Sequence, residues 1–390
     1  MLNRHLLRIK AMQTIYAYRQ ARVANYHLAL EQIAQHYANI LMIIGKQSFS
    51  RLHQEEIEAK TFFEQFYKQP SYNAPLQLSM NLTPQEVGSA VVLAYHQKNQ
   101  KDLQTFRTRM LKDTEMIFER YIRLLKLILM LADFVAQEHQ ERTERLQRDV
   151  KIPEELIRLM QNPLLETLRN LQEFEIEWSK KKFIWDINSI RTWYKILIKE
   201  EEFRKLLRDA QTPPYEIVRY IINQFIFKNE AIETYLEEQD INWSENRHIL
   251  KSMLLKTFKE KVENPDREMR LYTLSKNWED DGAFFLQLFD AVLANEEEFE
   301  KRIAEKSKKW AYERIAEIDK ILMHMALSEI ITFPSIPVKV TINEYIDISK
   351  EYSTPKSWQF INGILDVIVD ELEKEGRIRK SGRGLIDNKS

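Results

Sequence analysis

The sequence contains no cysteine and only seven glycines among 390 residues. Without cysteine the chain has no disulfide framework, no thiolate metal site and no thiol nucleophile. Glycine destabilises helix interiors, whereas Leu, Ile, Glu, Lys and Gln, which are abundant here, favour helix. Four of the glycines lie close to the C-terminus, at Gly363, Gly376, Gly382 and Gly384. We therefore predict an all-α fold in which most of the chain is helical.

The chain also lacks a long apolar run and an excess of either charge. No segment approaches the roughly 20 apolar residues of a membrane span, and the charged N-terminus differs from a signal peptide. The 58 basic residues nearly balance the 59 acidic ones. This balance excludes a uniformly basic nucleic-acid-binding protein but permits local basic patches. The sequence predicts a cytoplasmic protein with no membrane contact.

Catalytic signatures are missing as well. The sequence has no glycine-rich phosphate loop, no His-Glu-x-x-His and no nucleophile elbow. Its eight histidines are scattered. Acidic clusters such as Asp280-Asp281 are more typical of solvated helix starts than of metal sites. We predict no enzymatic activity, no cofactor and no bound metal.

Capping residues and prolines divide the first two thirds of the chain into predicted helices. Residues 2–45 should form one or two of them. Thr83, Pro84 and Glu86 match an N-cap, a first helical residue and a capping-box partner, so long helices are expected over about 84–148. Prolines then divide the next stretch into shorter helices, at Pro153, Pro163, Pro213 and Pro214.

Three further helices are predicted after a break at Asn264-Pro265-Asp266, over residues 266–275, 279–295 and 297–332. The turn from Phe333 to Pro337 should end the last of them, because proline cannot continue the helical ladder.

Two last helices are predicted beyond that turn. Thr341 and Glu344 match a second capping box, for a helix that ends near Tyr352. Thr354-Pro355 should cap the final helix, which runs to about Lys374. The basic tail from Gly376 is expected to be mobile unless bound.

The N-terminal helix has two predicted faces. Apolar residues at helical spacing form the predicted core face, at Leu2, Leu6, Ile9 and Tyr16. Four arginines lie within an arc of about 60° on a different face, at Arg4, Arg8, Arg19 and Arg22. Such a stripe suits RNA, because guanidinium groups bind phosphates and stack on bases, but a solvated basic face has the same pattern.

Two separated stretches resemble the NusB transcription antitermination family. The first, Arg4-His-Leu-Leu-Arg8-Ile-Lys10-Ala-Met-Gln13-Thr-Ile-Tyr16, is similar to the family's arginine-rich first helix. The second begins near Asp280-Asp281. It contains a tryptophan-started helix, an Ala-x-x-Glu pattern and two further matching segments, at Trp310–Leu322, Ala326–Glu329, Ile336–Glu344 and Phe360–Leu365.

This resemblance implies a discontinuous NusB-like helical bundle made of residues 1–30 and 266–390. Residues 31–265 would then be a helical insertion of unknown role. The resemblance also implies binding to the boxA element of ribosomal RNA leader transcripts. In the family this binding occurs together with NusE, a ribosomal protein, and with the elongating RNA polymerase.

The resemblance further assigns candidate residues. It implies RNA contacts by Arg4, Arg8, Lys10, Lys339 and Phe360, whereas Tyr16 and Asp319 match positions that face NusE. Lys356 replaces an acidic residue of the family and would add positive charge near Phe360. Each of three roles has a purely structural alternative. Lys339 could be an ordinary surface lysine, Phe360 a core residue, and Asp319 part of an intrahelical ion pair.

Two other functions stay open at this stage. The chain could be a helical scaffold that kept the NusB fold without RNA binding, since its arginine cluster is thinner than is usual in the family. It could also be the RNA-binding part of a ribosomal RNA methyltransferase system. The absence of catalytic cysteine disfavours this last alternative.

Overall fold

The computed structural model describes residues 3–69, 78–146, 151–180, 183–307 and 312–388. These residues lie in helices, turns and irregular segments, and none of them is in a strand. The predicted all-α fold is therefore confirmed. Among the described residues, no helix combines the length and apolar composition that a membrane crossing requires.

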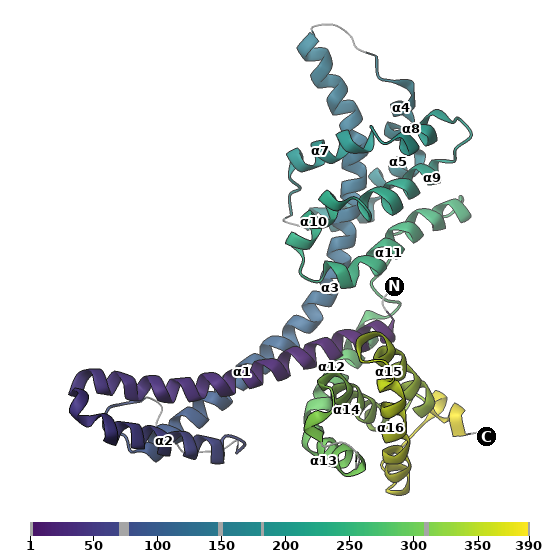
Figure 1. Cartoon of the computed structure of the whole chain (residues 1–390). Helices are drawn as coiled ribbons and strands as arrows, with labels where there is room; N and C mark the ends of the chain where they lie inside the picture. The colour runs from purple at the N-terminus through teal and green to yellow at the C-terminus, as the bar shows by residue number, and fades with distance from the viewer. Residues whose placement is uncertain (1–2, 70–77, 147–150, 181–182, 308–311, 389–390) are drawn as a thin grey trace. The chain divides into compact units, whose positions relative to one another are not determined.

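The chain divides into two compact units (Figure 1). The central unit comprises residues 112–278, and the discontinuous unit comprises residues 4–111 and 279–390. The long helix α3 (Pro84–Leu146) contributes to both and passes from one to the other after Leu111. The predicted insertion, residues 31–265, is consequently shared between the two units.

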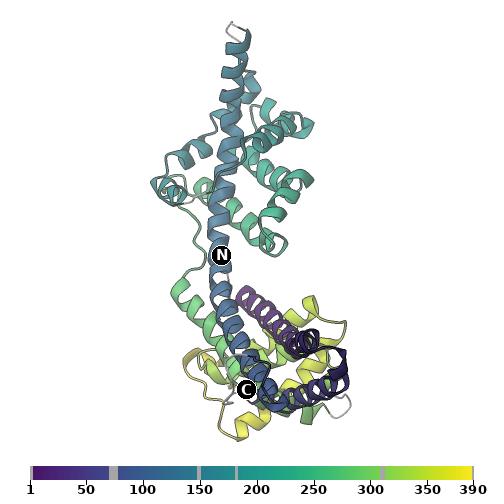
Figure 2. The same cartoon turned by 90° about the vertical axis from the view of Figure 1, so that its left-hand side faces the viewer.

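In the central unit, short helices gather along the second part of α3 (Figure 2). Many of the aromatic residues of this unit are buried there, among them Tyr121, Phe134, Trp185, Trp193 and Tyr194. The helices are α4 (Glu154–Met160), α5 (Pro163–Arg169), α6 (Gln172–Ser179), α7 (Ile187–Leu197), α8 (Glu201–Arg208), α9 (Pro214–Tyr220), α10 (Glu230–Gln239) and α11 (Trp243–Glu263).

The helix predicted at residues 266–275 is wrong, because that stretch is irregular. Its backbone groups bond to side chains instead of forming a helical ladder. The Leu271 N–H donates to Glu173 at 3.1 Å and the Tyr272 N–H to the Tyr121 hydroxyl at 3.0 Å. The central unit thus fixes this segment through long-range contacts that the local sequence does not contain.

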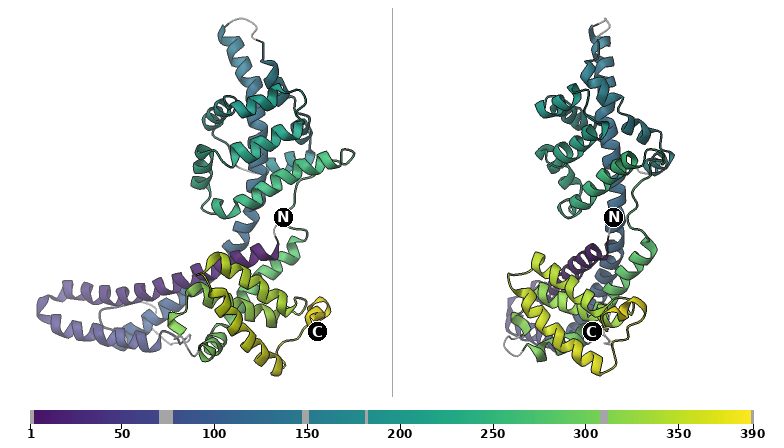
Figure 3. Two further views of the ribbon diagram at one scale, coloured as in Figure 1. Left: turned by 45° about the vertical axis from the view of Figure 1, so that its right-hand side comes forward. Right: turned by 90° about the vertical axis from the view of Figure 1, so that its right-hand side faces the viewer.

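The first part of the discontinuous unit is an antiparallel hairpin of α1 (Arg4–Ile44) and α2 (Phe49–Phe66), seen in Figure 3. The hairpin and the start of α3 share an apolar core that includes Tyr37, Phe63 and Val91. Gly88 permits the close contact of α3 with α2, because a Cβ there would lie 3.0 Å from the Ala59 carbonyl oxygen.

The rest of the discontinuous unit consists of α12 (Trp278–Ala294), α13 (Glu296–Lys306), α14 (Glu317–Thr332), α15 (Val338–Tyr352) and α16 (Ser357–Lys374). Helix α14 is its centre, since every residue from Ile321 to Ile330 is buried. A helix buried on all sides must be surrounded by other elements. Helices α1, α13, α15 and α16 contact it.

Several predicted boundaries are confirmed. Helix α3 begins at Pro84, where the Thr83 N–H donates to the Glu86 carboxylate at 2.8 Å and the Thr83 hydroxyl accepts from the Glu86 N–H at 3.3 Å. Helices α14, α15 and α16 end at Thr332, Tyr352 and Lys374, as predicted. The residues that stop a helix act locally, so the sequence reveals them.

Other boundaries are wrong. The helix predicted over 297–332 is broken between α13 and α14. Helix α15 begins at Val338 and not at a capping box, because the Thr341 hydroxyl bonds to Glu329 at 2.9 Å. Helix α16 begins only at Ser357. At α15 a tertiary partner takes the group that we expected to act locally, whereas at α16 the Thr354 hydroxyl bonds to Ser357, three residues on.

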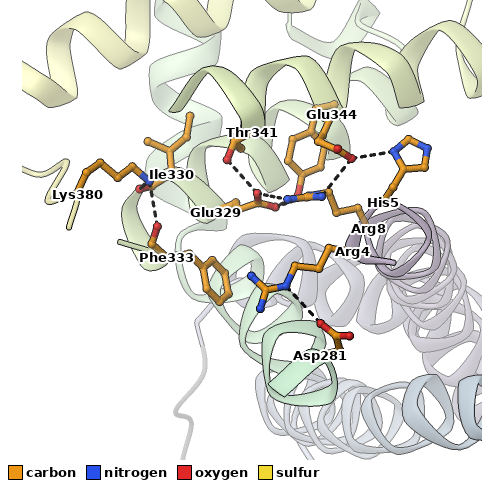
Figure 4. A network of polar contacts seen from close by, with 11 residues as sticks. Arg4, His5, Arg8, Asp281, Glu329, Ile330, Phe333, Thr341, Glu344 and Lys380 are labelled. Atoms are coloured by element: carbon orange, nitrogen blue, oxygen red, sulfur yellow. Dashed lines mark hydrogen bonds and ion pairs between the residues drawn. The ribbon is translucent and has the colours of Figure 1, made fainter. Parts of the chain in front are cut away.

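The C-terminal tail is held against the turn that follows α14 at Lys380 and Ser381, and its mobility when unbound stays a prediction. Lys380 Nζ donates to the carbonyl oxygens of Ile330 and Phe333 at 2.8 and 3.0 Å (Figure 4). The Ser381 N–H donates to the Pro334 carbonyl oxygen at 3.0 Å. The tail thereby satisfies carbonyl groups that the end of a helix leaves without partners.

Candidate functional site

The arginine face of α1 is directed into the discontinuous unit. Buried residues share this face, namely Leu7, Arg8, Ala11, Ile15 and Tyr18. Of the predicted core face, Ile9 is buried, but Tyr16 is 39% exposed. The arginine stripe is therefore a packing surface and not the exposed basic face that we expected, whereas the predicted core face is confirmed at Ile9 and wrong at Tyr16.

Arg8 forms the most buried of the arginine contacts (Figure 4). Its side chain is 3% exposed and that of Glu329 on α14 is fully buried. Arg8 Nε and Nη2 donate to the two Glu329 oxygens at 2.8 and 2.7 Å. Thr341 and Tyr345 of α15 donate to the same carboxylate, so Glu329 is fully paired.

The electrostatics of this cluster favour the charged pair. Burial alone would lower the pKa of Arg8, but the hydrogen bonds and the charge of Glu329 outweigh it and raise that pKa. Burial, reinforced by the charge of Glu329, raises the pKa of Tyr345 well above its ordinary value. Arg8 therefore stays charged and Tyr345 neutral at physiological pH, and the cluster joins α1, α14 and α15.

The other three arginines of the stripe also face carboxylates. Arg4 Nε donates to Asp281 at 3.4 Å, and its side chain is 37% exposed. Arg19 Nη1 lies 2.8 Å from Glu317. Arg22 Nη1 lies 2.6 Å from Glu296. Acidic residues from three C-terminal helices thus neutralise a face that looks purely basic in the N-terminal sequence.

The remaining candidates for RNA contact lie nearer the surface. Lys339 and Lys356 are exposed, whereas Lys10 and Phe360 are half-buried. Lys339 stands at the start of α15, and Lys356 follows its end. Helix α15 has 15 residues, which places the two lysines at opposite ends of a rod about 20 Å long.

Lys356 has an unusual backbone conformation. It is the N-cap of α16 and has a φ of 78°, in the left-handed region. Among the described residues it is the only non-glycine residue with positive φ. This conformation costs a side chain about 1–2 kcal/mol relative to glycine. The position therefore keeps a charged side chain where glycine would be more stable.

The two partner-facing candidates have different surroundings. Tyr16 is exposed, as a partner-binding residue should be. Asp319 is only 5% exposed. Its carboxylate accepts hydrogen bonds from the Ser353 and Ser357 hydroxyls at 2.5 and 2.8 Å. Asp319 is therefore not exposed as Tyr16 is, and it fixes the turn that leads into α16.

Sequence reasoning missed Trp358. Its ring is 38% exposed on α16, and Lys350 Nζ lies 5.7 Å from the ring centroid. An exposed tryptophan beside a cation is a common feature of binding surfaces. The signal was its place beside Lys356, on the polar side of an amphipathic helix. Gly363 on the same helix faces open space and permits no close helix contact.

The NusB family matches residues 244–370, from within α11 through most of α16. Residues 244–370 are a NusB family domain, called the NusB domain below. The resemblance predicted from the C-terminal motifs is confirmed. The first helix lies outside the matched residues, yet it packs on α14 of the NusB domain through Arg8 and Glu329.

Three relatives are each named transcription antitermination protein NusB. The Chloroherpeton thalassium protein is 42% identical over 104 residues, which are 27% of this chain and 49% of that protein. The Salinibacter ruber protein is 43% identical over 103 residues, 26% of this chain and 64% of that protein. The Geotalea daltonii protein is 42% identical over 89 residues, 23% of this chain and 61% of that protein.

The matched part of this chain thus spans between 49% and 64% of the length of these NusB relatives. The comparison with solved structures found no match.

Proposed function

We propose that this chain is a transcription antitermination factor that binds a boxA-type ribosomal RNA leader together with NusE and the elongating RNA polymerase. The observation that carries the proposal is the NusB domain, with 42–43% identity to proteins named for transcription antitermination. The proposed activity is binding, without catalysis.

In this proposal the RNA contacts are made by surface groups of the NusB domain and α1. Lys339 and Lys356 bind phosphates, and Lys10 and Arg4 extend the basic surface along α1. Phe360 stacks on a base, as half-exposed aromatic residues do in single-stranded RNA sites. Arg8 acts indirectly, since its ion pair with Glu329 holds α1 against the NusB domain.

The protein partner, NusE, would contact Tyr16 and the neighbouring surface of α1. A tyrosine suits such an interface because it offers a large apolar ring and a hydroxyl group at little entropic cost. Asp319 supports the site indirectly, because its carboxylate binds the Ser353 and Ser357 hydroxyls at the start of α16. The elongating RNA polymerase would be joined through this RNA–protein complex.

A scaffold without RNA binding is the second candidate, and the ion pairs on α1 favour it. Arg4, Arg8, Arg19 and Arg22 each face a carboxylate, so little of the predicted arginine stripe is left for RNA. The two candidates differ in whether Lys10, Lys339 and Lys356 contribute to RNA binding.

The test is a fluorescence-anisotropy titration of boxA RNA with the full chain and NusE, alongside a scrambled RNA at the same salt. The proposal expects tighter binding to boxA RNA. Replacing Lys10 and Lys339 with alanine and Lys356 with glycine should weaken binding about fivefold per lost phosphate contact at 0.1 M salt. Lys356→Gly removes the charge while relieving the left-handed backbone, so a loss of affinity cannot come from unfolding.

Lys301→Ala is the matched control. It removes one exposed lysine of α13, which pairs with Glu297, and should leave RNA affinity unchanged. Equal affinity for boxA and scrambled RNA would reject the proposal. Unchanged affinity in the three lysine variants, with NusE binding intact, would favour the scaffold.

A further inference from the structure

A groove in the central unit has a strongly basic lining. It has a volume of about 470 Å³ and lies between the last turns of α3 and helix α7 with the residues that follow it. Figure 1 shows these two helices near each other in that unit. The cations come from both sides, Arg142 and Arg145 from α3 and Arg191, Lys195 and Lys199 from α7 and its C-terminal turn.

The carboxylates of the groove do not neutralise it. Five cations face two carboxylates, Glu138 and Glu141, which gives a net charge of +3. Glu138 is bound by Arg142 at 2.8 Å and by the Tyr194 hydroxyl at 3.1 Å. Glu141 is bound by Arg191 at 2.6 Å.

Three cations of the groove are not paired with its two carboxylates. Among residues that the structure describes, no carboxylate lies within ion-pair distance of Arg145, Lys195 or Lys199. All three side chains are exposed.

A second groove, in the discontinuous unit, has a different balance of charges. The groove between α13 and α16 is also lined by charged residues, but five carboxylates face four cations there. Lys301 pairs with Glu297, Arg302 with Glu375 and Lys306 with Glu371. Three of the four cations on that surface are paired with its own carboxylates, whereas the groove beside α7 presents cations that an external anion can bind.

We propose that the groove between α3 and α7 binds the phosphate groups of single-stranded RNA. Phosphate oxygens only accept hydrogen bonds, as a site of lysine and arginine requires. Arg142 and Arg145 are three residues apart on α3 and so project from one side of that helix. Lys195 of α7 and Lys199 of its C-terminal turn line the other side of the groove, so that a strand between them could place successive phosphates near both sets.

The same geometry predicts binding without sequence preference. Phe134 and Tyr194 line the groove but are 4% and 1% exposed, so their rings are not available to stack on bases. Contacts limited to phosphates carry no sequence information. A groove also fits a strand better than it fits the flat surface of a lipid bilayer.

This site lies outside residues 244–370 and therefore outside the NusB domain. It would give the chain a second RNA-binding site. In this proposal the NusB domain binds the boxA element, and the groove binds another part of the same transcript without sequence preference. The inference rests on the proposed function only for the choice of RNA as the polyanion.

The test uses the full chain and a fluorescein-labelled single-stranded RNA of scrambled sequence, titrated at several salt concentrations. In the variant with Arg145→Ala, Lys195→Ala and Lys199→Ala, affinity should fall about 100-fold at 0.1 M salt. The slope of log K against log salt should become shallower by about 2, because three phosphate contacts are lost. Lys195→Arg with Lys199→Arg should keep the affinity.

The matched control replaces Lys301, Lys306 and Lys374 with alanine in the groove between α13 and α16. It lowers the net charge by the same amount and should leave affinity and slope little changed. An equal loss in both triple variants would overturn the proposal in favour of a general charge effect. Unchanged RNA affinity, or lost binding to phosphatidylglycerol vesicles in its place, would overturn it too.

The two proposals fail independently. The ratio of boxA to scrambled affinity reports on the NusB domain and should be the same in the groove variant. A ratio of one would reject the proposed function, while the salt slope of the groove variant would still decide this inference.

Discussion

Arg8 and Glu329 form a buried ion pair with two parallel hydrogen bonds, of 2.8 and 2.7 Å, across 321 residues of sequence. The pair joins the first helix of the chain to the central helix of the NusB domain. It changes the interpretation of the N-terminal basic motif, because Arg8, which we predicted to bind RNA, is buried and paired with Glu329.

Arg8→Met should destabilise the discontinuous unit by about 3–5 kcal/mol, since it leaves the Glu329 carboxylate buried without its cation. Urea unfolding followed by circular dichroism measures the loss. Arg107→Ala is the control, because the Arg107–Asp290 pair is exposed on both sides and should be worth less than about 1 kcal/mol. Equal stabilities of Arg8→Met and the unmodified chain would refute the structural role.

Asp319→Ala should loosen the start of α16 and cost about 1–3 kcal/mol, because the Ser353 and Ser357 hydroxyls lose their acceptor. Hydrogen exchange should rise first at residues 357–360. The control is Asp347→Ala, whose carboxylate is exposed and pairs only with Lys350. If exchange at α16 is the same in both variants, Asp319 does not fix this turn.

His324 should make the discontinuous unit less stable in mild acid. Arg19 can only donate, so the His324 Nδ1 3.3 Å away accepts and its Nε2–H faces the Tyr312 hydroxyl at 3.3 Å. Burial lowers the pKa of His324 to about 3, and the positive charges of Arg19 and Lys320 act in the same direction.

The unfolded histidine has a pKa near 6.5, so between about pH 6.5 and 3 the unfolded chain binds the extra proton. The stabilising contribution is therefore present above pH 6.5 and is lost as pH falls. Relative to His324→Gln, the unmodified chain should lose about 2 kcal/mol between pH 7 and 5. Parallel pH dependences of the two proteins would show that His324 titrates normally.

Gly384→Ala should release the C-terminal tail. A Cβ at Gly384 would lie 2.0 Å from the Pro334 carbonyl oxygen, which is far inside contact distance. Trypsin should then cut more rapidly after Lys380, whose amino group is otherwise bound to two carbonyl oxygens.

Gly363→Ala is the matched substitution with the opposite expectation. Gly363 lies within α16 and has open space around the Cβ position, so alanine should stabilise the helix by about 0.5–1 kcal/mol. Equal trypsin sensitivity of the two glycine variants would contradict the proposed clash at Gly384.

Local signals in the sequence were sufficient wherever the deciding atoms were close along the chain. Thr83 and Glu86 predicted the start of α3, and the proline turn after Phe333 predicted the end of α14. Three of the failures have one cause in common. Thr341, Asp319 and the backbone at Tyr272 each have a local partner available, but a residue far away in sequence binds them instead.

The amino-acid sequence was enough to fix the helical class, several helix ends and the NusB character of the C-terminal third, because these depend on propensity, caps and motifs. It could not say which way the arginine face of α1 points. A helix with four aligned arginines looks the same whether water or carboxylates lie opposite. The carboxylates that decide the matter, Glu296, Glu317 and Glu329, come some 300 residues later, and only folding brings them to α1.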